Sequence, residues 1–167
     1  MELKAALNKL KKNPEFKEWK KNKKNNYFSY AFKIVEKNKQ TDWQIGYYDP
    51  KTDKITTFIV EKADIKITPE EDIFKKESMK VNEINLKNVK LSLKQILDCC
   101  EKFKKKSYPK EDAIKKIAIL QNLEEFGDIW NITYINQNFN TLNMKLKSNN
   151  GKIIEHKLTN LFDFKQK

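Results

Sequence analysis

Trp43-Gln-Ile45-Gly-Tyr47 and Trp130-Asn-Ile132-Thr-Tyr134 carry one Trp-x-Ile-x-Tyr pattern twice, 87 residues apart in a chain of 167. Bulky apolar residues at alternate positions are typical of a strand with one buried face. A repeat at about half the chain length predicts two similar units, each built around one copy. We therefore expect these six residues to form the core of the repeat and to have a structural role.

The similarity extends beyond the two motifs when the chain is aligned on itself at this spacing without gaps. The matched pairs are apolar and fall in expected helices or strands: Leu10 with Leu97, Phe16 with Phe103, Tyr30 with Ile117, Phe32 with Ile119, Ile55 with Leu142 and Ile59 with Leu146. Leu7 and Phe58 fall instead on Lys94 and Lys145. Duplication of one unit accounts for the matches, and the alternative is the periodicity shared by any two amphipathic segments.

The N-terminal half has the pattern of helices followed by strands. Leucines at helical spacing and the Asn13-Pro14 pair predict a kinked helix or two successive helices over residues 2–24. Alternating apolar residues predict strands over 27–36, 43–47 and 55–60, then a short segment at 65–67. Thr68-Pro69-Glu70-Glu71 has the features of a helix start and predicts a short helix to about Glu77.

The C-terminal half repeats this order. Ser92-Leu-Lys-Gln95 is a capping box and predicts a helix that ends in Lys104–Lys106. Strands are expected over 113–123, 129–135, 142–146 and 152–158, and Asn149-Asn150-Gly151 favours a type I′ hairpin before the last.

The predicted fold class is therefore α+β, with two tandem αβββ(β) units that each pack a helix on an antiparallel sheet. Residues 1–77 form the first unit, 78–90 a connector and 91–167 the second unit. The two units either share one continuous sheet or pack as separate lobes, and they can form a single domain.

The second unit resembles a PepSY-type unit, a cystatin-like helix followed by a meander. The resemblance rests on Trp130–Tyr134, on the alternation Leu142-Asn-Met144-Lys-Leu146, and on Gly151 in the following hairpin. Lys147-Ser-Asn-Asn150 stands where the family has Asp-Ala-x-Thr, and Asp64 of the first unit stands where Gly is expected. The resemblance implies a helix packed across an antiparallel sheet, here in two tandem copies, and a role in binding or inhibition.

The chain is strongly basic, with 35 Lys, no Arg and a formal net charge of +12. This charge favours an anionic partner such as nucleic acid. The absence of Arg argues against base readout, because Arg makes the bidentate contacts to guanine that Lys does not make. Drift toward Lys-rich composition together with solubility is the alternative explanation of the charge.

Lysines that close the predicted helices are the candidate anion-binding residues: Lys20, Lys21, Lys23, Lys24, Lys104, Lys105 and Lys106. Cations at a helix C-terminus complement the macrodipole, which explains them structurally. In the functional interpretation they bind phosphates, with exposed Trp19, Tyr48 or Tyr108 stacking on bases.

We predict no catalytic residue, no metal site and no cofactor. His156 is the only histidine, so a multi-His metal site cannot form, and three glycines are too few for a phosphate-binding loop. Cys99 and Cys100 are adjacent and are not expected to form a disulfide, and Cys100 lies on an apolar row and should be buried.

The N-terminal segment has no continuous apolar stretch, and no segment reaches the ~18 apolar residues of a membrane span. We expect a cytoplasmic protein. The function predicted from the sequence is a non-enzymatic binding module that recognises a protein partner. The alternative is non-specific nucleic-acid binding through the lysine-rich helix ends.

Overall fold

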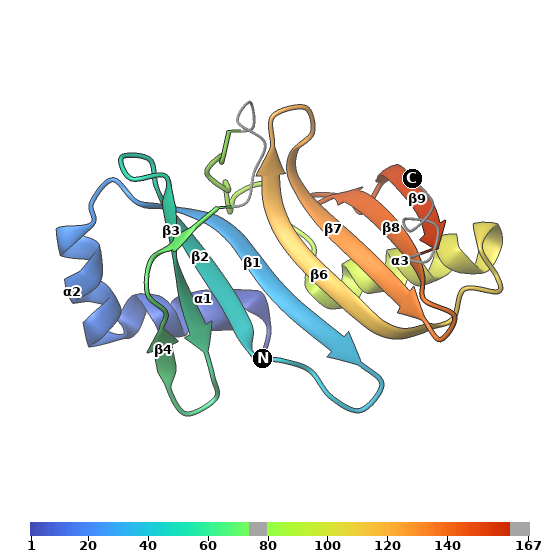
Figure 1. The fold of residues 1–167 in the computed structure, drawn as a ribbon, viewed down its shortest axis with the longest axis horizontal. Coiled ribbons are helices and arrows are strands. Elements are labelled where there is room, and N and C mark those ends of the chain that lie inside the picture. The colour runs from blue at the N-terminus through green and yellow to red at the C-terminus, as the bar shows by residue number, and fades with distance from the viewer. Residues whose placement is uncertain (74–79, 161–167) are drawn as a thin grey trace.

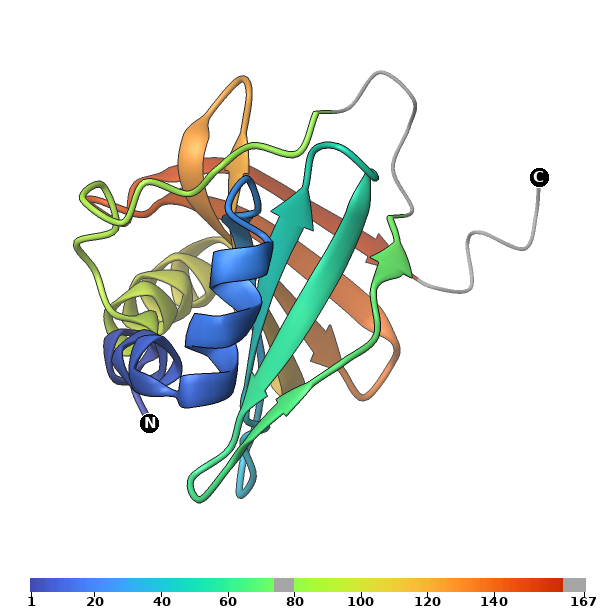
Figure 2. The same ribbon diagram turned by 90° about the vertical axis from the view of Figure 1, so that its left-hand side faces the viewer.

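The computed structural model describes residues 1–73 and 80–160 of the chain. These residues form one antiparallel sheet of nine strands in the order β4-β3-β2-β1-β6-β7-β8-β9, with β5 beside β3. Three helices pack on one face of the sheet (Figures 1 and 2). The predicted α+β class is confirmed, strands dominate the fold, and the sheet is continuous across both halves of the chain.

The helices are α1 (Leu3–Lys12), α2 (Pro14–Asn22) and α3 (Leu93–Ser107). The strands of the N-terminal half are β1 (Tyr27–Glu36), β2 (Trp43–Asp49), β3 (Lys54–Val60), β4 (Ile65–Ile67) and β5 (Glu71–Asp72). The strands of the C-terminal half are β6 (Ala113–Leu123), β7 (Gly127–Asn136), β8 (Asn140–Lys147) and β9 (Ile153–Asn160).

Local capping chemistry sets where the helices begin. The Asn13 side chain accepts a hydrogen bond from Phe16 N at 2.9 Å, and Pro14 occupies the first position of α2, where its missing N–H costs nothing. Ser92 and Gln95 form both bonds of a capping box at the start of α3. The N-terminal region is therefore two successive helices, one of the two forms expected from the sequence.

The short helix predicted over residues 68–77 is wrong where the structure describes it. Glu71 and Asp72 instead form β5 and pair with Ile55 and Lys54. Thr68 N also donates to Thr57 O at 2.9 Å, so this segment continues the pairing along the outer edge of β3. A helix there would leave the backbone groups of that edge unpaired. Residues 74–79 lie outside the described residues.

The hairpin between β8 and β9 forms as predicted, but its turn is not type I′. A type I′ turn needs positive φ at both central residues. In this turn only Gly151 has positive φ (72°), and its N–H donates to Lys147 O at 2.9 Å.

The two halves of the sheet are joined by β1 and β6. These strands pair antiparallel, with Phe32 opposite Ile119 and with Ala31 and Ala118 on the face toward the helices. Both alanines are fully buried, and their small side chains leave space for the indoles of Trp43 and Trp130, whose ring centroids are 6.3 Å apart. The two Trp-x-Ile-x-Tyr motifs therefore meet over the centre of the sheet.

All six motif residues are buried in one core: Trp43, Ile45, Tyr47, Trp130, Ile132 and Tyr134. Ile45 lies opposite Ala31 in the β1–β2 pair, and Ile132 lies opposite Ala118 in the β6–β7 pair. The two pairs of strands thus have the same register relative to the two motifs.

The ungapped alignment is wrong in the third strand of each half. Trp43 pairs with Val60, but Trp130 pairs with Leu146, so Val60 rather than Ile59 occupies the position of Leu146. The turn before β8 (137–139) is one residue shorter than the turn before β3 (50–53). A shift of one residue moves a side chain to the other face of a strand, so Phe58 is buried and Ile59 is on the opposite face.

Gly46 of β2 lies beneath the ring of Tyr30, its cross-strand neighbour on β1. A Cβ at Gly46 would lie 2.0 Å from Tyr30 Cε1, and the Tyr30 hydroxyl is held by Thr57 Oγ1 at 2.7 Å. The corresponding pair of the C-terminal half, Ile117 and Thr133, carries ordinary side chains. Glycine is therefore required here because a tyrosine ring occupies the space.

We predict that Gly46→Ala lowers the free energy of unfolding by about 1–3 kcal/mol, since it forces the packed ring to move. Urea unfolding followed by circular dichroism measures the change. In a Tyr30→Ala background the same substitution should cost much less. An equal cost in both backgrounds would show that the ring is not the cause.

Candidate functional site

The lysines at the end of α2 are engaged by different partners. Lys20 Nζ donates to the backbone oxygens of Lys23, Lys24 and Asn26, and so closes the end of the helix. Lys23 forms ion pairs with Glu70 at 2.7 Å and Asp49 at 3.5 Å, and the bond from Glu70 raises the pKa of Lys23. Lys21 pairs with Glu18, and Lys24 is exposed.

At the end of α3, too, one lysine is paired with a carboxylate while others are exposed. Lys104 is 5% exposed and pairs with Asp112, and this contact lowers the pKa of the Asp112 carboxyl. Lys105 and Lys106 are exposed. The two lysine groups lie at opposite ends of the molecule (Figure 1), so the structure does not bring the seven predicted residues together in one patch.

The aromatic residues expected beside these lysines are mostly packed. Tyr48 is buried, contrary to the prediction, and its hydroxyl donates to Asp53 Oδ1 at 2.6 Å. Trp19 packs edge-on against Phe58 with ring centroids 4.9 Å apart. Tyr108 is half-buried and shares a 2.7 Å hydrogen bond with His156 Nδ1. The sequence suggested exposure because aromatic residues occupy both faces of these elements, and only the tertiary structure shows what covers each face.

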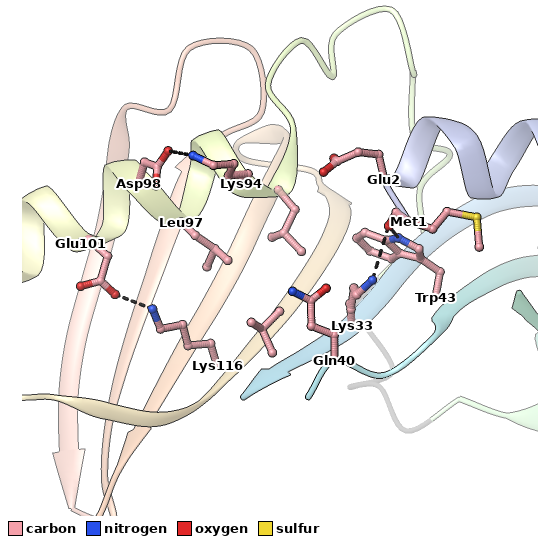
Figure 3. Close-up of a pocket in the computed structure, with 12 residues that line it drawn as sticks. Met1, Glu2, Lys33, Gln40, Trp43, Lys94, Leu97, Asp98, Glu101 and Lys116 are labelled. Carbon is pink, nitrogen blue, oxygen red and sulfur yellow. Dashed lines mark hydrogen bonds and ion pairs between the residues drawn. The ribbon is translucent and has the colours of Figure 1, made fainter. Parts of the chain in front are cut away.

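A pocket of about 280 Å³ lies where the two halves meet, between α3, the start of α1 and the central strands (Figure 3). Lys33 of β1 lines it and is only 4% exposed. Its ammonium lies 5.0 Å from the centroid of the Trp43 ring and 3.4 Å from Met1 O. Among the described residues no carboxylate forms an ion pair with it, so this pocket contains a buried cation without a counter-ion.

Lys33 is a position at which the two halves differ. On the other side of the centre, the strand neighbour of Trp130 is Leu120, which is fully buried. Burial lowers the pKa of Lys33, and the carboxylates of Asp42 and Glu2 act in the opposite direction. Sequence reasoning missed this residue because Lys33 lies among 34 other lysines. The alternation of large apolar residues is on Phe32 and Ile34, whereas Lys33 shares its face with Ala31, and the helices cover that second face.

Four of the five other charged side chains that line the pocket form two ion pairs, and the fifth is Glu2. Glu101 Oε1 lies 2.5 Å from Lys116 Nζ, and Lys94 Nζ lies 3.0 Å from Asp98 Oδ2 (Figure 3). The contact with Lys116 contributes to a lowered pKa of Glu101, against the opposing effect of burial. Because acidic and basic groups alternate on its walls, the pocket does not present the uniform positive surface that a polyanion requires.

Residues 1–73 and 80–160 contain no set of three or more His, Cys, Asp or Glu side chains that could hold a metal ion. Cys100 is fully buried, as predicted, and burial strongly raises the pKa of its thiol. No helix in the described ranges is long and apolar enough to cross a membrane.

The sheet face opposite the helices is not covered by any helix of the described chain (Figures 1 and 2). On β1 and β6 this face carries Phe32, Ile34, Ile117 and Ile119, which pair across the two strands and are half-buried. We name these four residues the central strip. The strip is bordered by a polar ladder in which Asn143 Nδ2 donates to Asn131 Oδ1 and Thr133 Oγ1.

The fold is shared with a solved structure of a putative lipoprotein from Clostridium difficile 630. The TM-score is 0.57 at 13% sequence identity, and the likeness covers 87% of this chain and 90% of the other. No family model and no curated protein matches the chain. At this identity the likeness defines the architecture alone.

We predict that Lys33→Met is more stable than the parent protein at pH 7. A lysine whose folded-state pKa lies below its unfolded value destabilises the fold when protonated, and stability rises with pH between the two values. The advantage of Lys33→Met should therefore shrink as the pH approaches about 10.4, the pKa of an exposed lysine. Urea unfolding of both proteins from pH 7 to 10.5 measures it, and a difference that does not change with pH contradicts the prediction.

Proposed function

We propose that this protein is a non-enzymatic binding module that recognises a protein partner on the uncovered face of its sheet. One observation carries the proposal: a nine-stranded sheet has all its described helices on one face, and the other face carries the central strip. An antiparallel sheet can present one face to solvent, but such a face is usually polar. Apolar side chains at its centre favour contact with another surface.

The charges around the central strip suggest the chemistry of the partner. Lys115 lies on β6, which carries half of the strip, and Lys145 and Lys157 lie further out on β8 and β9, in a chain of net charge +12. Lys115 and Lys145 pair with Glu36 and Glu155, which orders their side chains at the surface. A partner with an apolar patch and an acidic rim complements this face.

Site-specific photo-crosslinking tests the proposal. A photoreactive amino acid in place of Phe32 should crosslink one protein species in cell extract, whereas the same group in place of exposed Lys12 of α1 should not. Adding Ile119→Lys should reduce the Phe32 crosslink at least 10-fold because it places a charge in the strip, while Lys4→Glu on α1 should leave it unchanged. Equal crosslinking from both positions, or a crosslinked species removed by nuclease, would count against the proposal.

Nucleic-acid binding is the alternative function, and the exposed lysines at the two helix ends favour it. If the protein binds nucleic acid, fluorescence anisotropy with a labelled 20-mer oligonucleotide should show binding at about 50 mM salt and none by about 200 mM. We expect no saturable binding at either salt concentration, because the lysine groups are separated and partly paired with carboxylates. The matched variant replaces Lys24, Lys105 and Lys106 by Gln. Saturable binding at low salt that this variant loses would favour nucleic-acid binding.

We further propose that the chain arose by tandem duplication, with the boundaries 1–77, 78–90 and 91–167 and a PepSY-like unit in each half. Matching turns support this history. Asp49 and Asn136 each accept a 2.9 Å bond from the backbone N–H two residues later. Each turn also ends in a left-handed residue directly before the next strand, Asp53 with φ 56° and Phe139 with φ 58°.

The cytoplasmic location expected from the sequence remains a prediction. The name of the structurally similar protein favours a location outside the cytoplasm. Fractionation of the native host with an antibody to this chain decides between the two.

A further inference from the structure

Two adjoining cavities run between α1 and the segment 83–93. The first is about 670 Å³, and its lining combines the apolar residues Leu3, Leu7, Leu86, Val89, Leu91 and Leu93 with charged ones that include Lys4, Lys11 and Lys90. The second is about 440 Å³, and among its lining residues are Lys20, Asn26 and Tyr47. Leu7, Lys11 and Leu86 line both cavities, so together they form one groove with an apolar part and a polar end.

The polar end holds one buried hydrogen-bond donor that the described chain does not use, the side-chain amide of Asn26. Asn26 is 3% exposed, and its Nδ2 has no acceptor among the residues that the structure describes. A buried amide N–H without an acceptor is costly, which favours a ligand acceptor at this place.

Lys20 adds a positive charge at the same end. Its ammonium donates to backbone oxygens, and none of the described carboxylates forms an ion pair with it. Burial lowers the pKa of Lys20, with Glu83 acting in the opposite direction. Burial also raises the pKa of Tyr47, which lines the same end, to about 12.

The apolar part has one accessible wall, formed by the segment 86–91, and one buried wall. Leu86 is 38% exposed, and Val89 and Leu91 of the same segment are half-buried. Leu3 and Leu7 of α1 form the opposite wall. The volume of this part is within the range of about 300–1,000 Å³ that is usual for small-ligand sites.

We propose that this groove binds a long-chain monocarboxylate, with the carboxylate at Asn26 and Lys20 and the alkyl chain along Leu86, Leu7 and Leu91. The charged side chains that line the polar end are Lys11, Lys20 and Glu83, whose net charge of +1 matches one carboxylate rather than a dianionic head group. Such a ligand has an alkyl chain for the apolar part of the groove and a carboxylate for the adjoining polar end. This site lies on the helix-covered side and does not depend on the uncovered face.

Isothermal titration calorimetry with dodecanoate tests the site. The folded full-length protein should bind dodecanoate saturably, at least 10-fold more tightly than acetate and than dodecyltrimethylammonium. Acetate lacks the chain, and dodecyltrimethylammonium has the same chain with a cationic head. Absence of saturable dodecanoate binding, or equal affinity for the cationic amphiphile, would overturn the proposal.

Variants locate the two ends of the ligand. Lys20→Met and Leu86→Asp should each weaken dodecanoate binding at least 10-fold, whereas the matched variant Lys21→Met, one residue along α2, should not. Far-ultraviolet circular dichroism confirms that each variant is folded, and Leu86→Asp is a surface change that leaves the core intact. If both variants are folded and bind as tightly as the parent protein, the groove is not the site.

Discussion

The pairing of β1 with β6 is the constraint on which the rest of the structure depends. It joins two half-sheets into one, with Ala31 opposite Leu120 and Ala118 opposite Lys33, and the indoles of Trp43 and Trp130 meet over this junction. A larger residue at either alanine would separate the indoles and disturb the helices packed over them. Because α1 and α3 both begin near this centre, the pocket at Lys33 and the groove beside α1 are consequences of the same pairing.

The two halves share a framework, and the positions at which they differ are informative. Tyr30 with Gly46 replaces the ordinary pair of Ile117 with Thr133, and Lys33 lies beside Trp43 where Leu120 lies beside Trp130. Within residues 1–73 and 80–160, the N-terminal half has two helices where the C-terminal half has one, and α2 supplies Lys20 to the polar end of the groove. The candidate binding residues Lys20 and Lys33 therefore both lie in the N-terminal half, while the positions that match between the halves form the core.

The basic character of the chain has a different meaning in the folded protein than in the sequence. Lys23 and Lys104 are held by carboxylates, and Lys20 closes a helix end. Charge that looks like a binding surface in the sequence is in part internal compensation. The uncovered sheet face and the alkyl groove are both sites of apolar contact, and in each the lysines have a secondary role as a rim or as a single counter-charge.

The sequence by itself determined the α+β class, the capped starts of α2 and α3 and the strand positions, because these follow from hydrophobic periodicity and from hydrogen bonds between near neighbours. It did not determine that residues 71–72 pair with β3, since their partners Lys54 and Ile55 are not near neighbours in the chain. Nor could it show the one-residue shift at Val60, which depends on turn length, or the burial of Lys33 and Asn26. Those features were decided by the tertiary structure alone, because pairing between distant strands sets which face each side chain occupies and what covers it.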